Sequence, residues 1–70
     1  MKVSARNVLK GTITRITPGI VNAEVVITLP DGQQIVAVIT LASADALGLR
    51  VGQEAYAVIK ASDVMVGVDH

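Results

Sequence analysis

Residues 21–41 read VNAEVVITLPDGQQIVAVITL, and this stretch decides the fold. Over residues 21–29 the odd positions are all apolar and the even positions are mostly polar, which is the period of a β-strand. The Pro-Asp-Gly triplet at 30–32 then carries a turn signal. Apolar residues resume over 33–41, so the stretch predicts two strands joined as a β-hairpin.

The sequence on either side of this hairpin predicts more strands. Residues 8–16 contain a β-branched run and end at a Thr-Pro-Gly turn signal over 17–19. Residues 54–60 and 64–68 have the composition of two further strands. The sequence therefore predicts three strands before residue 42 and two after residue 53.

A single helix fits between these two groups of strands. Ser43 can cap residues 44–47, with Asp45 in the first turn, where the helix dipole favours an anion. Gly48 is placed for the left-handed residue that ends a helix. The predicted fold is all-β: a five-stranded OB-like barrel with one short helix between strands 3 and 4.

The composition indicates that the chain has more apolar surface than it can bury alone. The 70 residues form one domain, 1–70, with 51% hydrophobic and 17% charged residues, against about 25% charged in typical soluble domains. A domain of this size buries only about 60% of its unfolded surface. Residues 35–39 and 55–59 are apolar on both strand faces, which predicts a homo-oligomer. A thin barrel wall with scattered surface valines remains an alternative.

Charge, aromatic content and cysteine count exclude several classes of protein. No apolar run approaches the about 20 residues of a membrane-spanning helix, and the first residues lack a signal-peptide core. A formal net charge of zero, one tyrosine and no Phe or Trp argue against nucleic-acid binding. The absence of cysteine excludes disulfides, thiolate nucleophiles and zinc–sulfur sites. These features predict a cytoplasmic protein with no membrane or nucleic-acid partner.

The sequence offers no catalytic constellation. The single histidine, His70, is the last residue, where a frayed tail is expected rather than a general base. The six carboxylates are scattered, and no nucleotide-binding, metalloprotease or serine-hydrolase motif occurs. We therefore expect a protein that is not an enzyme.

Two polar clusters lie near opposite ends of the sequence. They are Ser4, Ala5, Arg6 and Asn7 near the start, and Lys60, Ala61 and Ser62 near the end. Both supply hydrogen-bond donors and cations, which suit a tetrahedral oxyanion that presents only acceptor atoms. On residue types alone, a solvated N-terminal lead-in and an ordinary turn explain the two segments better than a binding site does.

Four short motifs carry a resemblance to a known family. Residues 4–11 match SARNxLKG, residues 19–25 match GxVxAEV, residues 39–43 are close to I(S/T)xxS, and residues 60–65 match K(A/S)(S/T)DVM. In this order, over residues 3–66, the chain resembles the molbindins, or Mop proteins, of the wider TOBE family.

The resemblance implies a cytoplasmic protein that binds molybdate, and usually tungstate, without an organic cofactor. Such proteins are hexamers, built as trimers of dimers of OB-like barrels, with anions held between subunits. It implies anion contacts from Ser4, Ala5, Arg6 and Asn7 of one chain, completed by Lys60, Ala61 and Ser62 of a neighbour, and a packing or main-chain contact from Val21. With no fused domain expected, a role in molybdenum storage or homeostasis follows. A structural or regulatory oligomerisation module and an OB-type nucleic-acid module are the alternatives.

Overall fold

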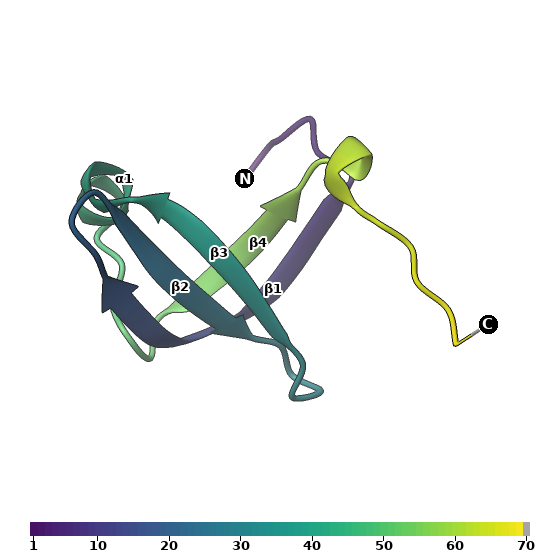
Figure 1. Ribbon diagram of the computed structural model, residues 1–70, viewed down its shortest axis with the longest axis horizontal. Coiled ribbons are helices and arrows are strands. Elements are labelled where there is room, and N and C mark those ends of the chain that lie inside the picture. Colours follow the sequence, from purple (N-terminus) through teal and green to yellow (C-terminus); the bar gives the residue numbers. More distant parts are fainter. Residues whose placement is uncertain (70) are drawn as a thin grey trace.

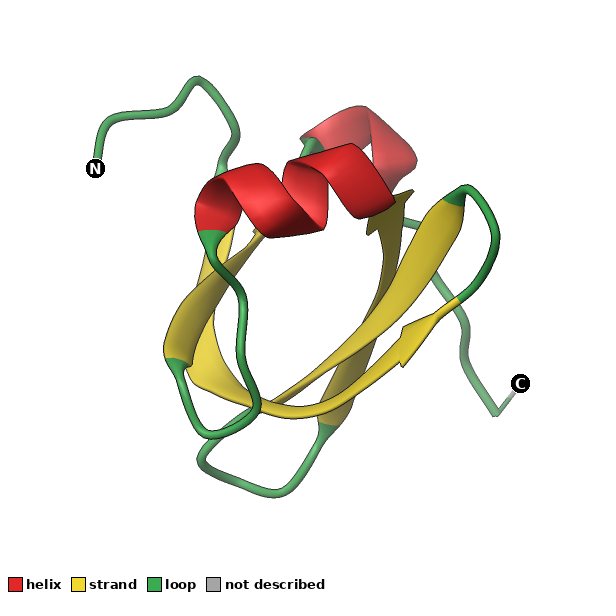
Figure 2. Cartoon of the chain, turned by 90° about the vertical axis from the view of Figure 1, so that its left-hand side faces the viewer, coloured by secondary structure: helices red, strands yellow, loops and turns green. Residues whose placement is uncertain are grey.

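The computed structural model describes residues 1–69 as one curled sheet with two short helices (Figure 1). The elements are β1 (Asn7–Pro18), β2 (Asn22–Thr28), β3 (Gln34–Thr40), α1 (Leu41–Leu47), β4 (Glu54–Ile59) and the 3-10 helix η1 (Ala61–Asp63). The strands follow the order β3-β2-β1-β4, and each neighbouring pair is antiparallel. The sheet curls into a half-barrel, and α1 lies across its upper side in Figure 2.

The predicted hairpin is confirmed as β2 and β3. The two strands pair from Asn22 opposite Thr40 to Thr28 opposite Gln34. In the turn, the Asp31 carboxylate accepts a hydrogen bond from the Gln33 N–H at 3.1 Å. Gly32 has a φ of 92°, a left-handed conformation that glycine adopts without steric cost. The turn residues therefore fix the register that the alternation of β2 requires.

Strand β1 is shared between two halves of the sheet. Residues 7–12 pair with β4, whereas residues 12–18 pair with β2, and the register shifts between Ile13 and Arg15. At this change of partner, the Ile13 N–H donates to the Gln53 carbonyl at 2.9 Å, and the Ile13 carbonyl accepts from the Gly52 N–H at 2.7 Å. Such irregularities bend a strand and increase its twist, so β1 can serve both pairings.

The core lies on the concave side of the half-barrel and is small. Its fully buried members are Ile13, Val25, Ile27 and Ala57, and the partly buried residues packed on them are Ile16, Ile35, Ile39, Leu49 and Ala55. Ile13 sits at the bend of β1 with 1% of its surface exposed. All four strands contribute to this one cluster.

The prediction of a fifth strand at residues 64–68 is wrong for the isolated chain. This segment belongs to no strand and pairs with none. It follows η1 and runs away from the body of the molecule (Figure 1). A strand requires an edge to hydrogen-bond, and the direction of the chain after η1 brings this segment to none. The fold is therefore an open half-barrel of four strands rather than a closed barrel of five.

The predicted helix begins earlier than expected. Thr40, not Ser43, is the N-cap: the Thr40 hydroxyl accepts from the Ser43 N–H at 3.0 Å and donates to the Ser43 hydroxyl at 2.8 Å. The last residue of β3 already has the extended backbone of an N-cap, so α1 starts directly at Leu41. The prediction that Asp45 lies in the first turn is wrong for the same reason. Gly48 ends α1 with a φ of 63°, as predicted.

The first predicted strand is longer than expected at its far end. Strand β1 continues through residues 17 and 18, where the sequence predicts a turn. The actual turn follows, closed by a hydrogen bond from the Gly19 N–H to the Asn22 carbonyl at 2.7 Å. Pro18 is compatible with the end of a strand, since its missing N–H removes no interior ladder bond there.

Strands β3 and β4 are apolar on both faces, as the composition predicts. Val36 and Val38 on β3 are 57% and 65% exposed, and Tyr56 and Val58 on β4 are each 46% exposed. The inward residues of the same strands pack on the core. No helix within residues 1–69 has the length and apolar character needed to cross a membrane.

Gly11 should be intolerant of a side chain. It is buried in β1, and a Cβ there would lie 2.6 Å from the Thr28 carbonyl oxygen and 2.7 Å from the Ile27 Cγ2. We expect Gly11→Ala to lower the free energy of unfolding by about 1–3 kcal/mol, measured by urea denaturation. The comparison is Gly19→Ala, whose Cβ meets only the Asn22 carbonyl oxygen at 3.1 Å and should cost clearly less. Equal stability of the two variants would contradict this account of the β1–β2 contact.

Candidate functional site

The pairing of β1 with β4 brings the two polar clusters of the sequence together. Asn7, the first residue of β1, lies opposite Ile59, the last residue of β4. The residues before Asn7 and those after Ile59 therefore leave the sheet at the same place (Figure 1). Segments 52 positions apart along the chain become neighbours through the strand ladder alone.

A shallow pocket of about 220 Å³ opens between these segments. Its lining residues are Ser4, Ala5 and Arg6 from the N-terminal lead-in, and Lys60, Ala61 and Ser62 from the end of β4 and η1. Six of the eight residues that the sequence predicts for a site thus form one surface. We call it the donor pocket. All its members except half-buried Ala5 are exposed.

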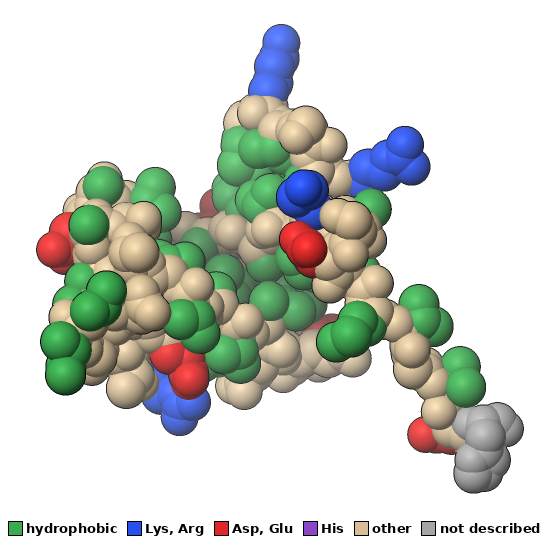
Figure 3. Space-filling view, turned by 45° about the horizontal axis from the view of Figure 1, so that its top comes forward, with side chains coloured by type: hydrophobic (Ala, Val, Ile, Leu, Met, Phe, Trp, Pro, Cys, Tyr) green, Lys and Arg blue, Asp and Glu red, His purple; other side chains and the backbone are tan. Residues whose placement is uncertain are grey.

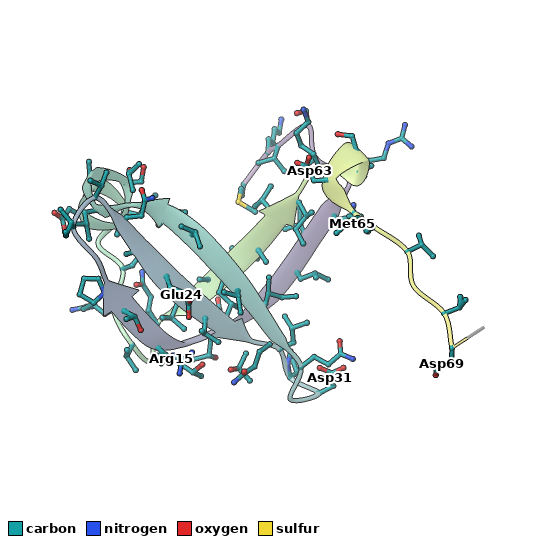
Figure 4. The ribbon with its side chains drawn as sticks, in the orientation of Figure 1. Arg15, Glu24, Asp31, Asp63, Met65 and Asp69 are labelled. Carbon is teal, nitrogen blue, oxygen red and sulfur yellow. The ribbon has the colours of Figure 1, made fainter. Side chains whose placement is uncertain are left out.

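The donor pocket holds polar groups that the protein itself does not engage. Among residues 1–69, no hydrogen bond or ion pair occupies the side chains of Arg6 or Lys60. By contrast, Lys10 pairs with Glu54 and Arg15 pairs with Glu24, each at 3.3 Å. Figure 4 shows the second pair side by side on β1 and β2. The two pocket cations are therefore available to a ligand.

The polar groups of the pocket suit an anion. Arg6 and Lys60 offer charged N–H donors, and hydroxyls and backbone N–H groups can add neutral donors. Figure 3 shows several Lys and Arg side chains projecting from this end of the molecule. Asp63 lies on η1 (Figure 4) but does not line the pocket. The pocket lining therefore combines two cations with no carboxylate.

Asn7 stands beside the donor pocket rather than in it. Its side-chain amide is half-buried and donates to the Ile59 carbonyl oxygen at 3.3 Å. This bond ties the start of β1 to the end of β4, the two points from which the pocket segments emerge. In this chain Asn7 therefore positions the two segments.

Val21 lies away from the donor pocket of its own chain. It precedes β2, its carbonyl accepts from the Leu41 N–H at 2.9 Å, and its side chain is 67% exposed. It thus stands where α1 begins, whereas the pocket lies beside η1 (Figure 1). A contact between Val21 and an anion in a donor pocket requires a second copy of the chain.

Other kinds of site are absent from the part of the chain that the structure describes. Residues 1–69 contain no group of three or more His, Cys, Asp or Glu side chains that could hold a metal ion. The predicted tail residue His70 lies outside the described residues. The lining of the donor pocket contains no histidine and no carboxylate.

A second hollow was not predicted from the sequence. Strands β3 and β4, the two edges of the sheet, face each other across a groove of about 460 Å³ lined mainly by residues 35–39 and 56–59. We call it the β3–β4 groove. The groove is open because no fifth strand lies between the two edges, although the sequence predicts a fifth strand.

A model of the TOBE domain matches residues 3–66 of the chain. A probable molybdenum-pterin-binding protein of Haemophilus influenzae is 51% identical over 69 residues, which cover 99% of this chain and all of that protein. The resemblance deduced from the four motifs is thereby confirmed.

Solved structures agree with the half-barrel described above. MopII from Clostridium pasteurianum, in an apo form, superposes with a TM-score of 0.90 and 42% identity, covering 96% of this chain and all of that one. The cytoplasmic molybdate-binding protein ModG, solved with molybdate bound, gives a TM-score of 0.82 and 54% identity. That match covers 87% of this chain and 43% of ModG.

The amide of Asn7 should contribute measurably to stability. Asn7→Ala removes its hydrogen bond to the Ile59 carbonyl, which should lower the free energy of unfolding by about 1 kcal/mol in chemical denaturation. The matched control is Asn22→Ala, because Asn22 is exposed and its side chain makes no hydrogen bond within residues 1–69. If Asn7→Ala lowers the free energy of unfolding no more than the control does, Asn7 does not position the two segments.

Proposed function

The chain belongs to the TOBE domain family, among the molybdenum-pterin-binding (Mop) proteins, and we propose that it binds molybdate, and tungstate, as free oxyanions. The donor pocket is the observation that carries this proposal. The proposed contact residues are Ser4, Ala5, Arg6, Lys60, Ala61 and Ser62, with Asn7 positioning them and Val21 contributed by another copy.

The charge of the pocket matches that of the ligand. Molybdate is a tetrahedral dianion with four acceptor oxygens, and the pocket offers two cations with no carboxylate in its lining. Hydrogen bonds in which one partner is charged are about twice as strong as neutral ones. The small side chains of Ala5 and Ala61 leave room for the backbone to approach the anion.

The same lining argues for an oxyanion rather than a pterin. A flat heterocycle is held by stacking on an aromatic face and by mixed donors and acceptors. The only aromatic residue in the chain, Tyr56, lines the β3–β4 groove and not the donor pocket. The pocket side chains can donate to an oxyanion, and none of them supplies an aromatic face.

We further propose that the anion is enclosed between copies of the chain. The donor pocket is open and its residues are largely exposed, so a single copy would leave the anion in contact with water. The exposed valines of β3 and β4 provide apolar surface for assembly. A hexamer built as a trimer of dimers, acting in cytoplasmic molybdenum storage or homeostasis without catalysis, follows from the family resemblance.

Molybdate should bind to the purified protein and raise its thermal stability. We expect isothermal titration calorimetry to detect binding of molybdate and tungstate, with much weaker binding of phosphate. A protonated phosphate carries a hydroxyl donor, and the pocket lining offers no carboxylate to accept from it. A ligand that binds only the folded protein raises Tm by mass action. Absence of binding of both metal oxyanions would refute the proposed function.

The guanidinium of Arg6 should account for a large part of the affinity. Arg6→Ala should weaken molybdate binding about 10- to 150-fold, because a hydrogen bond to a charged group contributes about 1.5–3 kcal/mol. Arg50→Ala is the control, since it removes the same charge from a residue outside the donor pocket. An equal loss of affinity in both variants would indicate a general charge effect and would contradict the placement of the binding site in this pocket.

A further inference from the structure

Asp63 is the residue that follows the donor pocket along η1. It comes directly after Ser62, the last pocket residue in the sequence, and Figure 4 shows it on η1 close to the N-terminal lead-in. The Asp63 N–H donates to the Lys60 carbonyl at 2.9 Å, which closes one turn of the 3-10 helix. Residues three positions apart in such a turn lie above one another, so Asp63 and Lys60 stand on the same side of η1. A carboxylate therefore lies next to the pocket without lining it.

The fold of η1 does not use the Asp63 carboxylate. Within residues 1–69 the side chain of Asp63 is exposed and makes no hydrogen bond or ion pair, not even with nearby Lys60. Both hydrogen bonds of η1 join backbone groups: the Asp63 N–H bonds to Lys60, and the Val64 N–H bonds to the Ala61 carbonyl at 3.3 Å. An uncharged side chain at position 63 would leave these bonds in place. The charge of Asp63 is thus separable from the local structure.

The same charge does affect an anion in the donor pocket. Arg6 and Lys60 attract the anion and Asp63 repels it, so these three side chains present one net positive charge to a dianion. Coulomb energy falls only with the inverse of distance, and a carboxylate can therefore act without touching the ligand. Over about 8 Å near a protein surface, its repulsion of a dianion corresponds to about a 3- to 10-fold change in affinity. Direct contact as an acceptor does not fit, because molybdate at neutral pH carries no hydrogen to donate.

We propose that Asp63 limits the affinity of the donor pocket for dianionic oxyanions. The carboxylate acts through space, as a fixed negative charge that weakens the hold of Arg6 and Lys60 on the ligand. The bound anion then exchanges with solvent more readily than two cations alone would allow. This inference rests on the proposed oxyanion function and deepens it, since it gives a role to a residue outside the pocket lining.

Two tetrahedral anions of similar size and different charge test the proposal. Tungstate is a dianion and perrhenate is a monoanion, and each presents four oxygens. Because through-space repulsion scales with the charge of the ligand, Asp63→Asn should tighten tungstate binding about 3- to 10-fold and perrhenate binding only about 2- to 3-fold. Isothermal titration calorimetry at low ionic strength measures the affinity for tungstate. Displacement of tungstate measures the affinity for perrhenate.

Salt provides a second readout on the same variant. The Debye length is about 10 Å at 0.1 M ionic strength and about 3 Å at 1 M, so added salt screens a charge that does not touch the ligand. We expect the gain of Asp63→Asn over the unmodified chain to shrink towards none as ionic strength rises. A gain that is independent of salt would overturn a through-space role.

Asp45→Asn is the matched control. It removes the same charge from α1, away from the pocket beside η1 (Figure 1), and the Asp45 side chain is likewise exposed without a hydrogen bond within residues 1–69. This variant should bind both anions as the unmodified chain does. Asp63→Glu restores the carboxylate and should lose the gain of Asp63→Asn. The Tm of ligand-free Asp63→Asn should equal that of the unmodified chain, which separates an effect on binding from one on the fold.

The outcomes distinguish this inference from the proposed function. An unchanged or weaker affinity of Asp63→Asn for tungstate would overturn the role of Asp63 alone. An equal gain for tungstate and perrhenate would overturn it as well, because a change in pocket shape does not depend on ligand charge. Absence of tungstate binding to the unmodified chain would instead refute the oxyanion function, and the inference would fall with it.

Discussion

The rest of the structure depends on the change of partner along β1. One strand pairs with β4 over its first half and with β2 over its second, and the bend between the halves is buried at Gly11 and Ile13. Gly11 allows β1 to lie against the backbone of Thr28 at a distance that no side chain permits. Without this contact the two halves of the sheet would not curl around one core.

The donor pocket is a consequence of the same strand. Pairing with β4 sets Asn7 opposite Ile59, and the segments that continue from these two residues supply the two cations. Each segment alone is an ordinary exposed loop. The two segments suit an anion only because they lie close together. Two neighbouring cations create a local positive potential, and this does not require a broad basic face or a positive net charge. A chain of zero net charge can therefore present a local surface that suits an anion.

The sequence predicts those features that depend on local patterns. Alternation over residues 21–29 and the Pro-Asp-Gly turn were sufficient for the β2–β3 hairpin, and Gly48 was sufficient for the end of α1. The start of α1 was less predictable, because Thr40 and Ser43 are both residue types that cap helices well. Thr40 is the cap because β3 ends at this residue. The pairing of β1 with β4 is non-local, so the motifs identified the pocket residues while the structure supplied their proximity.

The predicted fifth strand differs from these cases, because residues 64–68 form no strand even though their sequence resembles one. Residues 64–68 have the composition of a strand, but a strand also requires an edge with which to form hydrogen bonds. The apolar excess of the chain lies in the same places: the two free edges, their outward valines and this segment. A domain of about 70 residues is only marginally stable alone, so covering these apolar regions would stabilise it. The difference between sequence and structure is therefore informative, because it shows that a strand pattern is necessary for a strand but not sufficient. The pattern of residues 64–68 therefore identifies a segment suited to a strand, whereas the four strands of the single chain offer it no partner.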